Sequence, residues 1–179
     1  MNMKASTTIQ DGGSSWTAMD QMGTATIEKT SLILRKRNVK QGPVLIDLDF
    51  AGDKAAGKMG INGQDRPIAV DLGGLLLADA AGGNQTVASL PLAVGYTTSF
   101  RNFDVQAQKV KLLHLSVSGI EKVTVTAGTF EAYRVEVSSA DGGGDKKTIW
   151  VAKDTYIVVK VSAVVASMGG AVLTQELTE

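Results

Sequence analysis

The sequence has no cysteine, a single histidine and few aromatic side chains, and each shortage removes a class of function. Without cysteine the chain has no disulfides, no thiol nucleophile and no cysteine-based zinc site. The one histidine, His114, argues against a typical zinc site, and no Gly-x-Ser-x-Gly elbow supplies a serine nucleophile beside it. Because aromatic residues make up 5% of the chain, aliphatic side chains must fill most of its core.

An excess of charge of either sign is also missing, since 18 Lys and Arg balance 18 Asp and Glu. The chain therefore has no net field that would favour nucleic acid or an anionic membrane surface. No apolar run reaches the roughly 18 residues of a transmembrane helix. We therefore expect no nucleic-acid partner and at most a peripheral association with a membrane.

The length of 179 residues fits one domain. We predict a single domain over residues 16–179, preceded by a disordered tail or linker over residues 1–15. That tail is polar and rich in Ser, Thr and Gly. It has no apolar signal-peptide core, so the sequence leaves open whether a signal peptide or another domain precedes it.

Strand signals dominate what the sequence does contain, and the clearest stretch is Val123–Val151. Apolar and polar residues alternate there in runs separated by breaks at Ala127–Thr129 and Ala140–Asp145. Side chains on a strand point alternately to opposite faces. The stretch therefore predicts three strands joined by two turns, each strand with one apolar face.

Similar patterns recur along the chain. Val44–Phe50 alternates most regularly, Asn62-Gly63 predicts a hairpin turn, and Pro67 predicts an edge strand or a strand start. About ten strands with short connections predict a mainly β fold, a single antiparallel meander. A sheet of that size must curl or split, so we expect a strongly curved sheet or an open half-barrel.

One short helix is expected around residues 74–81. Leu75–Ala81 has high helix propensity and is followed by Gly82-Gly83, a common helix stop. We expect this helix to cover part of the concave side of the sheet.

Two segments imitate functional sites. Gly52–Lys58 has the Gly-x-x-x-x-Gly-Lys spacing of a phosphate-binding loop, but Met59 stands where Ser or Thr should hold magnesium. Its glycines and Asn62-Gly63 favour a hairpin over the helix that such a loop requires. The basic residues of Arg35–Lys40 are interpreted as a solvated turn.

Asp47 and Asp49 lie two residues apart, so they share one face of the predicted strand. Paired carboxylates can hold calcium or act as acid and base, but the alternation favours the solvent face of an amphipathic strand. His114 is interpreted as an ordinary strand side chain. An enzyme using Asp47, Asp49 or His114 remains an alternative hypothesis, and we expect no enzyme activity, no cofactor and no metal.

Three motifs in the second half carry a resemblance. They are Leu90-Pro91-Leu92 with Gly95-Tyr96, the run from Val123 through Ala127-Gly128-Thr129-Phe130 to Val137, and Trp150-Val151-Ala152 with Asp154. Over Leu90–Glu179 the chain resembles the bacterial exported β-sheet family catalogued as domain of unknown function 3108. Thr126 replaces the proline that usually precedes Ala-Gly-Thr-Phe in that family.

The resemblance implies a periplasmic or exported protein with no assigned catalytic residues. The family is similar in shape to the curved half-barrels of lipoprotein carriers such as LolA and LolB, which hold acyl chains on a concave apolar face. It also occurs as an accessory domain beside peptidase-like domains.

Two functions follow as hypotheses. In the first, the chain is a non-catalytic exported β domain that binds a lipid or lipoprotein acyl chain on its concave face. The expected ligand-facing residues are Leu75, Leu76, Leu77, Met59 and Phe100, although such apolar side chains usually just pack in a core. In the second, the chain is a structural or interaction domain attached to a larger enzyme of the cell envelope.

Overall fold

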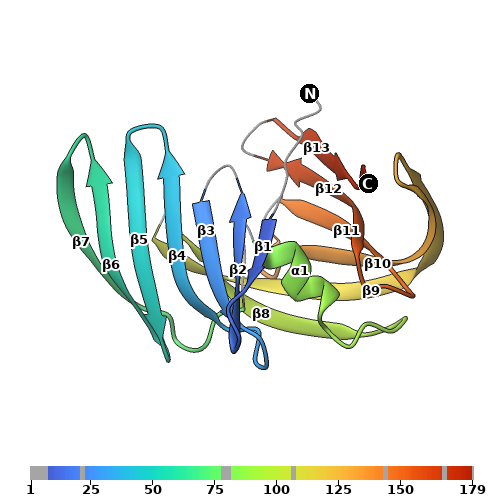
Figure 1. The fold of residues 1–179 in the computed structure, drawn as a ribbon, viewed down its shortest axis with the longest axis horizontal. Helices are drawn as coiled ribbons and strands as arrows, with labels where there is room; N and C mark the ends of the chain where they lie inside the picture. The colour runs from blue at the N-terminus through green and yellow to red at the C-terminus, as the bar shows by residue number, and fades with distance from the viewer. Residues whose placement is uncertain are drawn as a thin grey trace. The chain divides into compact units, whose positions relative to one another are not determined.

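The computed structural model describes residues 8–20, 23–77, 82–105, 108–142, 145–166 and 169–178. Within these residues the chain forms thirteen β-strands in two antiparallel sheets and one short helix (Figure 1). The chain divides into two compact units. Of the described residues, the N-terminal unit holds those from 8 to 86 and from 101 to 111, and the C-terminal unit holds 87–100 and those from 112 onward. The mainly β, antiparallel prediction is confirmed.

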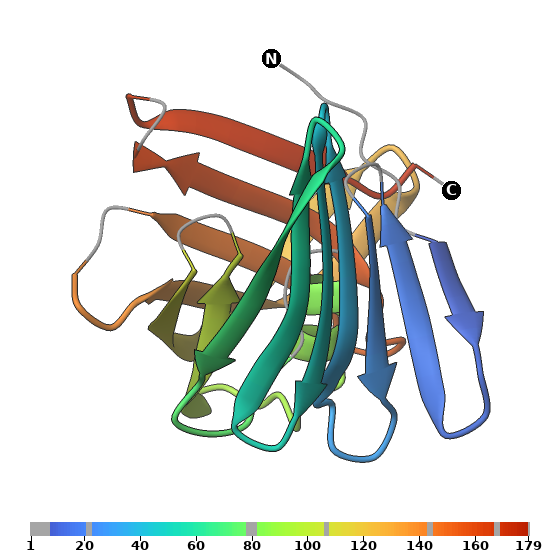
Figure 2. The same cartoon turned by 90° about the vertical axis from the view of Figure 1, so that its left-hand side faces the viewer.

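The N-terminal unit is built on a seven-stranded sheet whose strands pair in chain order, as in a meander. Figure 2 shows these strands side by side. They are β1 (Thr8–Asp11), β2 (Ser15–Asp20), β3 (Gly23–Glu28), β4 (Leu34–Gln41), β5 (Val44–Ala51), β6 (Lys54–Ile61) and β7 (Gln64–Asp71).

One face of this sheet is apolar because the alternation in the sequence places every second side chain there. On β5, Ile46, Leu48 and Phe50 are buried. The N-terminal core also contains Ala18, Ala25, Ile27, Leu34, Val39, Ala55, Ile68, Leu72, Leu76, Phe103 and Val105. The ring of Phe50 meets that of Phe103 edge to face, with centroids 6.4 Å apart.

Local turn chemistry sets the hairpins of this sheet. Asn62 and Gly63 join β6 to β7 with φ angles of 52° and 80°, the left-handed pair of a type I′ turn, which confirms the predicted hairpin. Gly52 and Asp53 join β5 to β6, so Gly52–Lys58 is a strand hairpin and not a phosphate-binding loop. Pro67 lies on β7, the last strand of the sheet order, as its missing N–H predicts.

The C-terminal unit is built on a six-stranded sheet with the order β13-β12-β11-β10-β9-β8. The strands are β8 (Thr97–Asp104), β9 (Lys109–Val125), β10 (Gly128–Ser139), β11 (Lys146–Ala152), β12 (Val158–Val165) and β13 (Ala171–Glu176). The residues of β8 and β9 are shared with the N-terminal unit, since 101–111 belong to that unit. The three strands predicted from Val123–Val151 are present.

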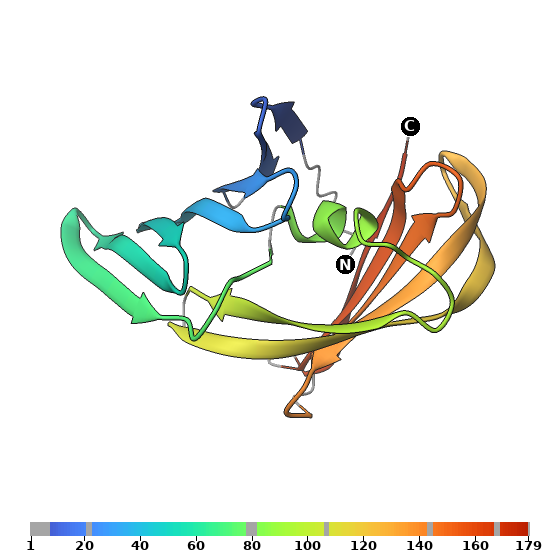
Figure 3. The same ribbon diagram turned by 90° about the horizontal axis from the view of Figure 1, so that it is seen from below.

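Both faces of the six-stranded sheet carry apolar clusters. The main C-terminal core contains Val87, Ala88, Leu92, Leu115, Val117, Tyr133, Val135, Val137, Ile149, Val151 and Val161. The smaller hairpin cluster contains Val123, Val125, Ala132, Ala152 and Val159, with Phe130, Trp150 and Leu177 packed against it. The β9–β10 hairpin is strongly curved (Figure 3), and its ladder shifts register between Arg134 and Val135, where a bulge increases the bend.

The one described helix, α1 (Gly83–Ala88), lies further along the chain than the predicted position of 74–81. Residues 78–81 lie outside the described residues, and Gly74–Leu77 are not helical. Instead, Leu76 forms a β-bridge with Arg101, and Leu77 forms one with Ile33. Pairing with distant strands therefore outweighs the helix propensity of the leucines.

Other differences concern the first third of the chain. The basic residues of Arg35–Lys40, interpreted from the sequence as a solvated turn, lie on β4. Thr8–Asp11, inside the predicted tail, forms β1 and pairs with β2. The prediction of one domain over residues 16–179 stays a prediction, because two compact units can belong to one domain.

Candidate functional site

The five predicted ligand-facing residues do not form one exposed surface. Leu76 is 3% exposed inside the N-terminal core, and Met59 is half-buried against the same core. Leu77 is half-buried, whereas Leu75 is 52% exposed. Phe100 packs against the main core of the C-terminal unit. Most of these side chains therefore have a packing role, and only Leu75 is presented to solvent.

A buried cation, Arg37, lies on the apolar face of the seven-stranded sheet, although the sequence predicted a solvated turn for Arg35–Lys40. Arg37 is 9% exposed, and its direct cross-strand partners are Leu48 on β5 and Ala25 on β3. Directly opposite residues share a face of the sheet, so the guanidinium leaves β4 on the side of the N-terminal core. A buried charge is costly unless it is paired, and Arg37 does have an interaction within the protein.

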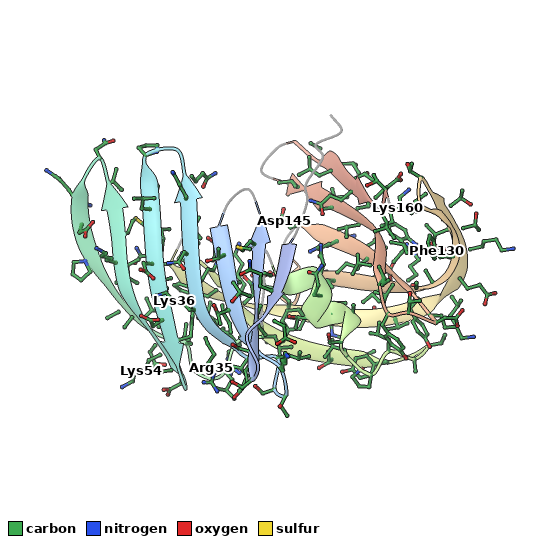
Figure 4. The ribbon with its side chains drawn as sticks, viewed as in Figure 1. Arg35, Lys36, Lys54, Phe130, Asp145 and Lys160 are labelled. Carbon is green, nitrogen blue, oxygen red and sulfur yellow. The ribbon has the colours of Figure 1, made fainter. Side chains whose placement is uncertain are left out.

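Asp47 and Asp49 lie on the opposite, polar face of this sheet. The ammonium of Lys36 on β4 lies 3.4 Å from the Asp47 carboxylate and 3.8 Å from that of Asp49. Figure 4 labels Lys36 and its chain neighbour Arg35, which both belong to β4. The two carboxylates thus take part in cross-strand ion pairs on a half-exposed face, as the alternation predicted.

The same polar face continues this ladder of charges to the sheet edge. Lys58 on β6 is the cross-strand partner of Asp47, and its ammonium donates to Asp65 on β7 at 2.7 Å. The hydrogen bond and the charge of Asp65, followed by the charge of Asp47, raise the pKa of Lys58 above its usual value. Opposite charges alternate from β4 to β7, which suits a solvated sheet face and leaves no carboxylate cluster for calcium.

His114 lies on a strand, β9, as predicted, and its side chain is exposed. Its Nδ1 lies 3.3 Å from the hydroxyl of Ser99 on β8. The residue opposite His114 on β10 is Ser138, so its strand neighbour supplies a hydroxyl and not a carboxylate. Among the described residues, no group of three or more His, Asp or Glu side chains could hold a metal ion.

Trp150 on β11 has side-chain partners on β9 and β12. Its indole N–H donates to the Glu121 carboxylate on β9, and the Lys160 ammonium on β12 lies 5.8 Å from the ring centroid. Lys160 in turn pairs with Glu176 at 2.8 Å. Figure 4 shows Lys160 on this sheet together with Phe130 of the hairpin cluster. These contacts brace the sheet, so the motif containing Trp150 has a folding role.

An exposed apolar patch at the end of the C-terminal sheet was not predicted from the sequence. Ile120, Tyr156 and Ile157 are 42%, 47% and 49% exposed. Ile120 is the cross-strand partner of Tyr133, and the Tyr156 ring lies 6.4 Å from that of Tyr133, centroid to centroid. Ile157 follows Tyr156 directly. These four residues are called the tyrosine patch below.

The backbone holds the tyrosine patch in a conformation that costs free energy. Tyr156 has a φ of 55°, in the left-handed region that residues with a side chain rarely adopt. Its N–H donates to Ala152 O at 2.9 Å, and Ala152 N–H donates to Ile157 O at 2.8 Å. The sequence signal is two large apolar residues, Tyr156 and Ile157, directly after the polar segment Lys153–Thr155.

Comparison with known proteins assigns the chain to a family. A family profile described as protein of unknown function, DUF3108, matches residues 81–178. The chain therefore belongs to this family, and the resemblance noted from the sequence motifs is confirmed at that level. No curated protein and no solved structure matches the chain. Among the described residues, none of the helical structure has the length and apolar character needed to cross a membrane.

The family motifs lie in packed parts of the C-terminal unit. Leu92 is buried in the main core, and Leu90 and Tyr96 pack against it. Phe130 and Trp150 pack against the hairpin cluster. The matched residues thus explain a shared scaffold, and a binding surface has to be sought in the side chains that the scaffold leaves exposed.

Proposed function

We propose that the chain is a non-catalytic interaction domain of an exported cell-envelope protein, and that it binds an apolar segment of a partner chain. The tyrosine patch is the observation that supports this proposal. Two large exposed apolar side chains, Ile120 and Tyr156, lie beside Tyr133, and the exposed Ile157 follows Tyr156 in the chain. Tyrosine side chains of this kind often dominate the binding energy of protein interfaces. The strained backbone at Tyr156 is further support, because such strain clusters at functional positions.

Site-specific photocrosslinking in the native host tests the proposal. A photoreactive amino acid at position 157 should give a discrete crosslinked product that a Tyr156→Ser substitution removes. The same amino acid at position 45 is the control, because Leu45 is 55% exposed but lies on the polar face of the seven-stranded sheet. Equal products from both positions, or none from position 157, would contradict the proposal, and cell fractionation checks the expected export.

A second candidate function is the binding of an amphiphile with an anionic head group, such as a fatty acid or the acyl part of a lipoprotein. Its support is Arg37, a buried cation on the apolar face of the N-terminal unit, with Met59 half-buried against the same core. A guanidinium carries five N–H donors, so it can keep a partner within the protein and still bind a carboxylate.

Native mass spectrometry and titration with a fluorescent fatty acid test this second function. Arg37→Met keeps much of the side-chain volume and removes the charge, so it should weaken fatty-acid binding at least tenfold. Arg35→Met is the matched control, because Arg35 is an exposed neighbour that pairs with Glu28 at 2.8 Å. Equal binding by the wild type and Arg37→Met would rule out this function.

A further inference from the structure

Strand β13 is an edge strand without the usual protection against strand pairing. It lies at one end of the six-stranded sheet, and among the described residues only β12 pairs with it (Figure 1). Its sequence, Ala-Val-Leu-Thr-Gln-Glu, has no proline and no lysine, and its ladder with β12 runs without a bulge. Edge strands in natural proteins usually carry a proline, a lysine or a bulge that prevents pairing with another chain, and β7 carries Pro67.

The hairpin of β12 and β13 is apolar on both faces near its turn. Val164 lies opposite Val172 on one face, and Ala163 lies opposite Leu173 on the other. Val172 is 56% exposed, and the other three side chains are half-buried. An extended, apolar and partly exposed edge is a template for another strand.

The hydrogen bonds to β12 show which backbone groups of β13 point outward. Leu177 N–H donates to Val159 O at 2.9 Å, and this pair continues the register that places Glu176 opposite Lys160. Hydrogen-bonded pairs alternate along an antiparallel ladder, so Gln175 and Leu173 also face β12. The N–H and C=O groups of Val172, Thr174 and Glu176 therefore point away from the sheet.

We propose that β13 binds β13 of a second copy of this chain, antiparallel, with a two-fold axis at Leu173. In this register Leu173 meets its own symmetry mate, and Val172 meets Thr174 of the other copy. The outward-pointing groups of Val172 and Thr174 then exchange hydrogen bonds, and each face of one sheet continues into the same face of the other. Shifting the axis to Thr174 would place Val172 opposite Glu176, so the Leu173 register is favoured.

Charge is compatible with two copies meeting at this edge. Glu176 is the only charged residue of β13, and Lys160 of the same chain pairs with its carboxylate at 2.8 Å. In the Leu173 register, Glu176 lies at the end of the pairing, opposite the Gly170 turn. The two edges therefore meet without uncompensated like charges near the axis.

Cysteine crosslinking tests the register directly, because the chain has no cysteine of its own. Leu173 and its mate form a pair without hydrogen bonds, whose Cα atoms lie about 4.5 Å apart, within the range of a disulfide. Leu173→Cys should form a covalent dimer on mild oxidation, and Gln175→Cys should not. Efficient crosslinking through Val172→Cys or Thr174→Cys instead would place the axis elsewhere and overturn the proposed register.

Sedimentation equilibrium of the full chain tests the pairing itself. Val172→Pro removes an outward N–H and leaves the ladder to β12 intact, so the dimer should weaken roughly tenfold or more. Val172→Thr keeps the N–H and should keep the dimer. Val172→Lys places like charges near the axis and should dissociate the dimer in a salt-dependent way, whereas Val94→Lys, at a 60% exposed valine outside β13, should not. A wild-type chain that stays monomeric at all concentrations would overturn the proposal.

Discussion

Two glycines show how single residues set the spacing of the seven-stranded sheet. A Cβ at Gly57 on β6 would lie 1.9 Å from the carbonyl oxygen of Asp47 on β5. A Cβ at Gly23 on β3 would lie equally close to the carbonyl oxygen of Asn38 on β4. Both glycines therefore allow a backbone approach that no other residue permits. From the sequence alone, the glycines of Gly52–Lys58 only favoured a hairpin.

Gly57→Ala should destabilise the protein by about 2–3 kcal/mol, because the β5 backbone has to move to make room for the methyl group. Gly119→Ala is the matched control. Gly119 also lies in a strand, but nothing lies within 4 Å of the Cβ position, so its free energy of unfolding should change little. Urea unfolding of both variants measures the difference, and equal effects would contradict the close approach.

Glu28 provides a prediction about pH at the scale of one residue. Hydrogen bonds from Ser31 and then from Arg35 hold its pKa below the ordinary 4.5. Because the folded pKa is lower than the unfolded one, the ionised carboxylate stabilises the fold above pH 4.5, and this contribution is lost as the pH falls through the folded pKa. In an NMR titration, Ser31→Ala should raise the Glu28 pKa more than Arg35→Gln does. The opposite order would contradict the assigned cause.

At the scale of elements, local signals predicted turns well and the helix poorly. Asn62-Gly63 was predictable because a type I′ turn depends on two residues alone. Leu76 and Leu77 were not, because their bridges join Arg101 and Ile33, which are distant in sequence. The predicted ligand-facing residues likewise depend on contacts that are distant in sequence. The predicted ligand residues are apolar by type, but only the fold decides that Leu76 packs in a core and Leu75 does not.

Substitution of two adjacent leucines tests whether Leu76 packs in the core and Leu75 does not. Leu76→Ala should cost about 2–5 kcal/mol, because the side chain is 3% exposed and its removal leaves a cavity in the N-terminal core. Leu75→Ala should change stability by less than about 0.5 kcal/mol, because Leu75 is 52% exposed. Chemical unfolding measures both. Equal costs would mean that Leu75 also packs in the core.

At the scale of the whole molecule, the family match and the compact units do not coincide. The family profile covers residues 81–178, but residues 101–111 within that range belong to the N-terminal unit. Phe103 and Val105 from this segment are buried in the N-terminal core. The sequence could not show this division, because nothing in the alternation of β8 or β9 marks the residue at which one core ends and the other begins.

The matched region alone, residues 81–178, should therefore expose an apolar surface. Without the first seven strands, Phe103 and Val105 lose the N-terminal core, so the fragment should bind a hydrophobic dye strongly and aggregate. Phe103→Ser with Val105→Ser should reduce dye binding in the fragment. Leu112→Ser is the control, because Leu112 is already 49% exposed in the whole chain. A soluble fragment that does not bind the dye would contradict this division of the cores.

The return of residues 101–111 to the N-terminal unit also affects biosynthesis. During synthesis β1–β7 emerge from the ribosome before Phe103 and Val105 do, so part of the apolar face of the new sheet stays uncovered for that interval. During that interval the exposed apolar surface makes the nascent chain prone to aggregation. Codons that slow translation after β7 would prolong this exposure, whereas fast translation through β8 would shorten it.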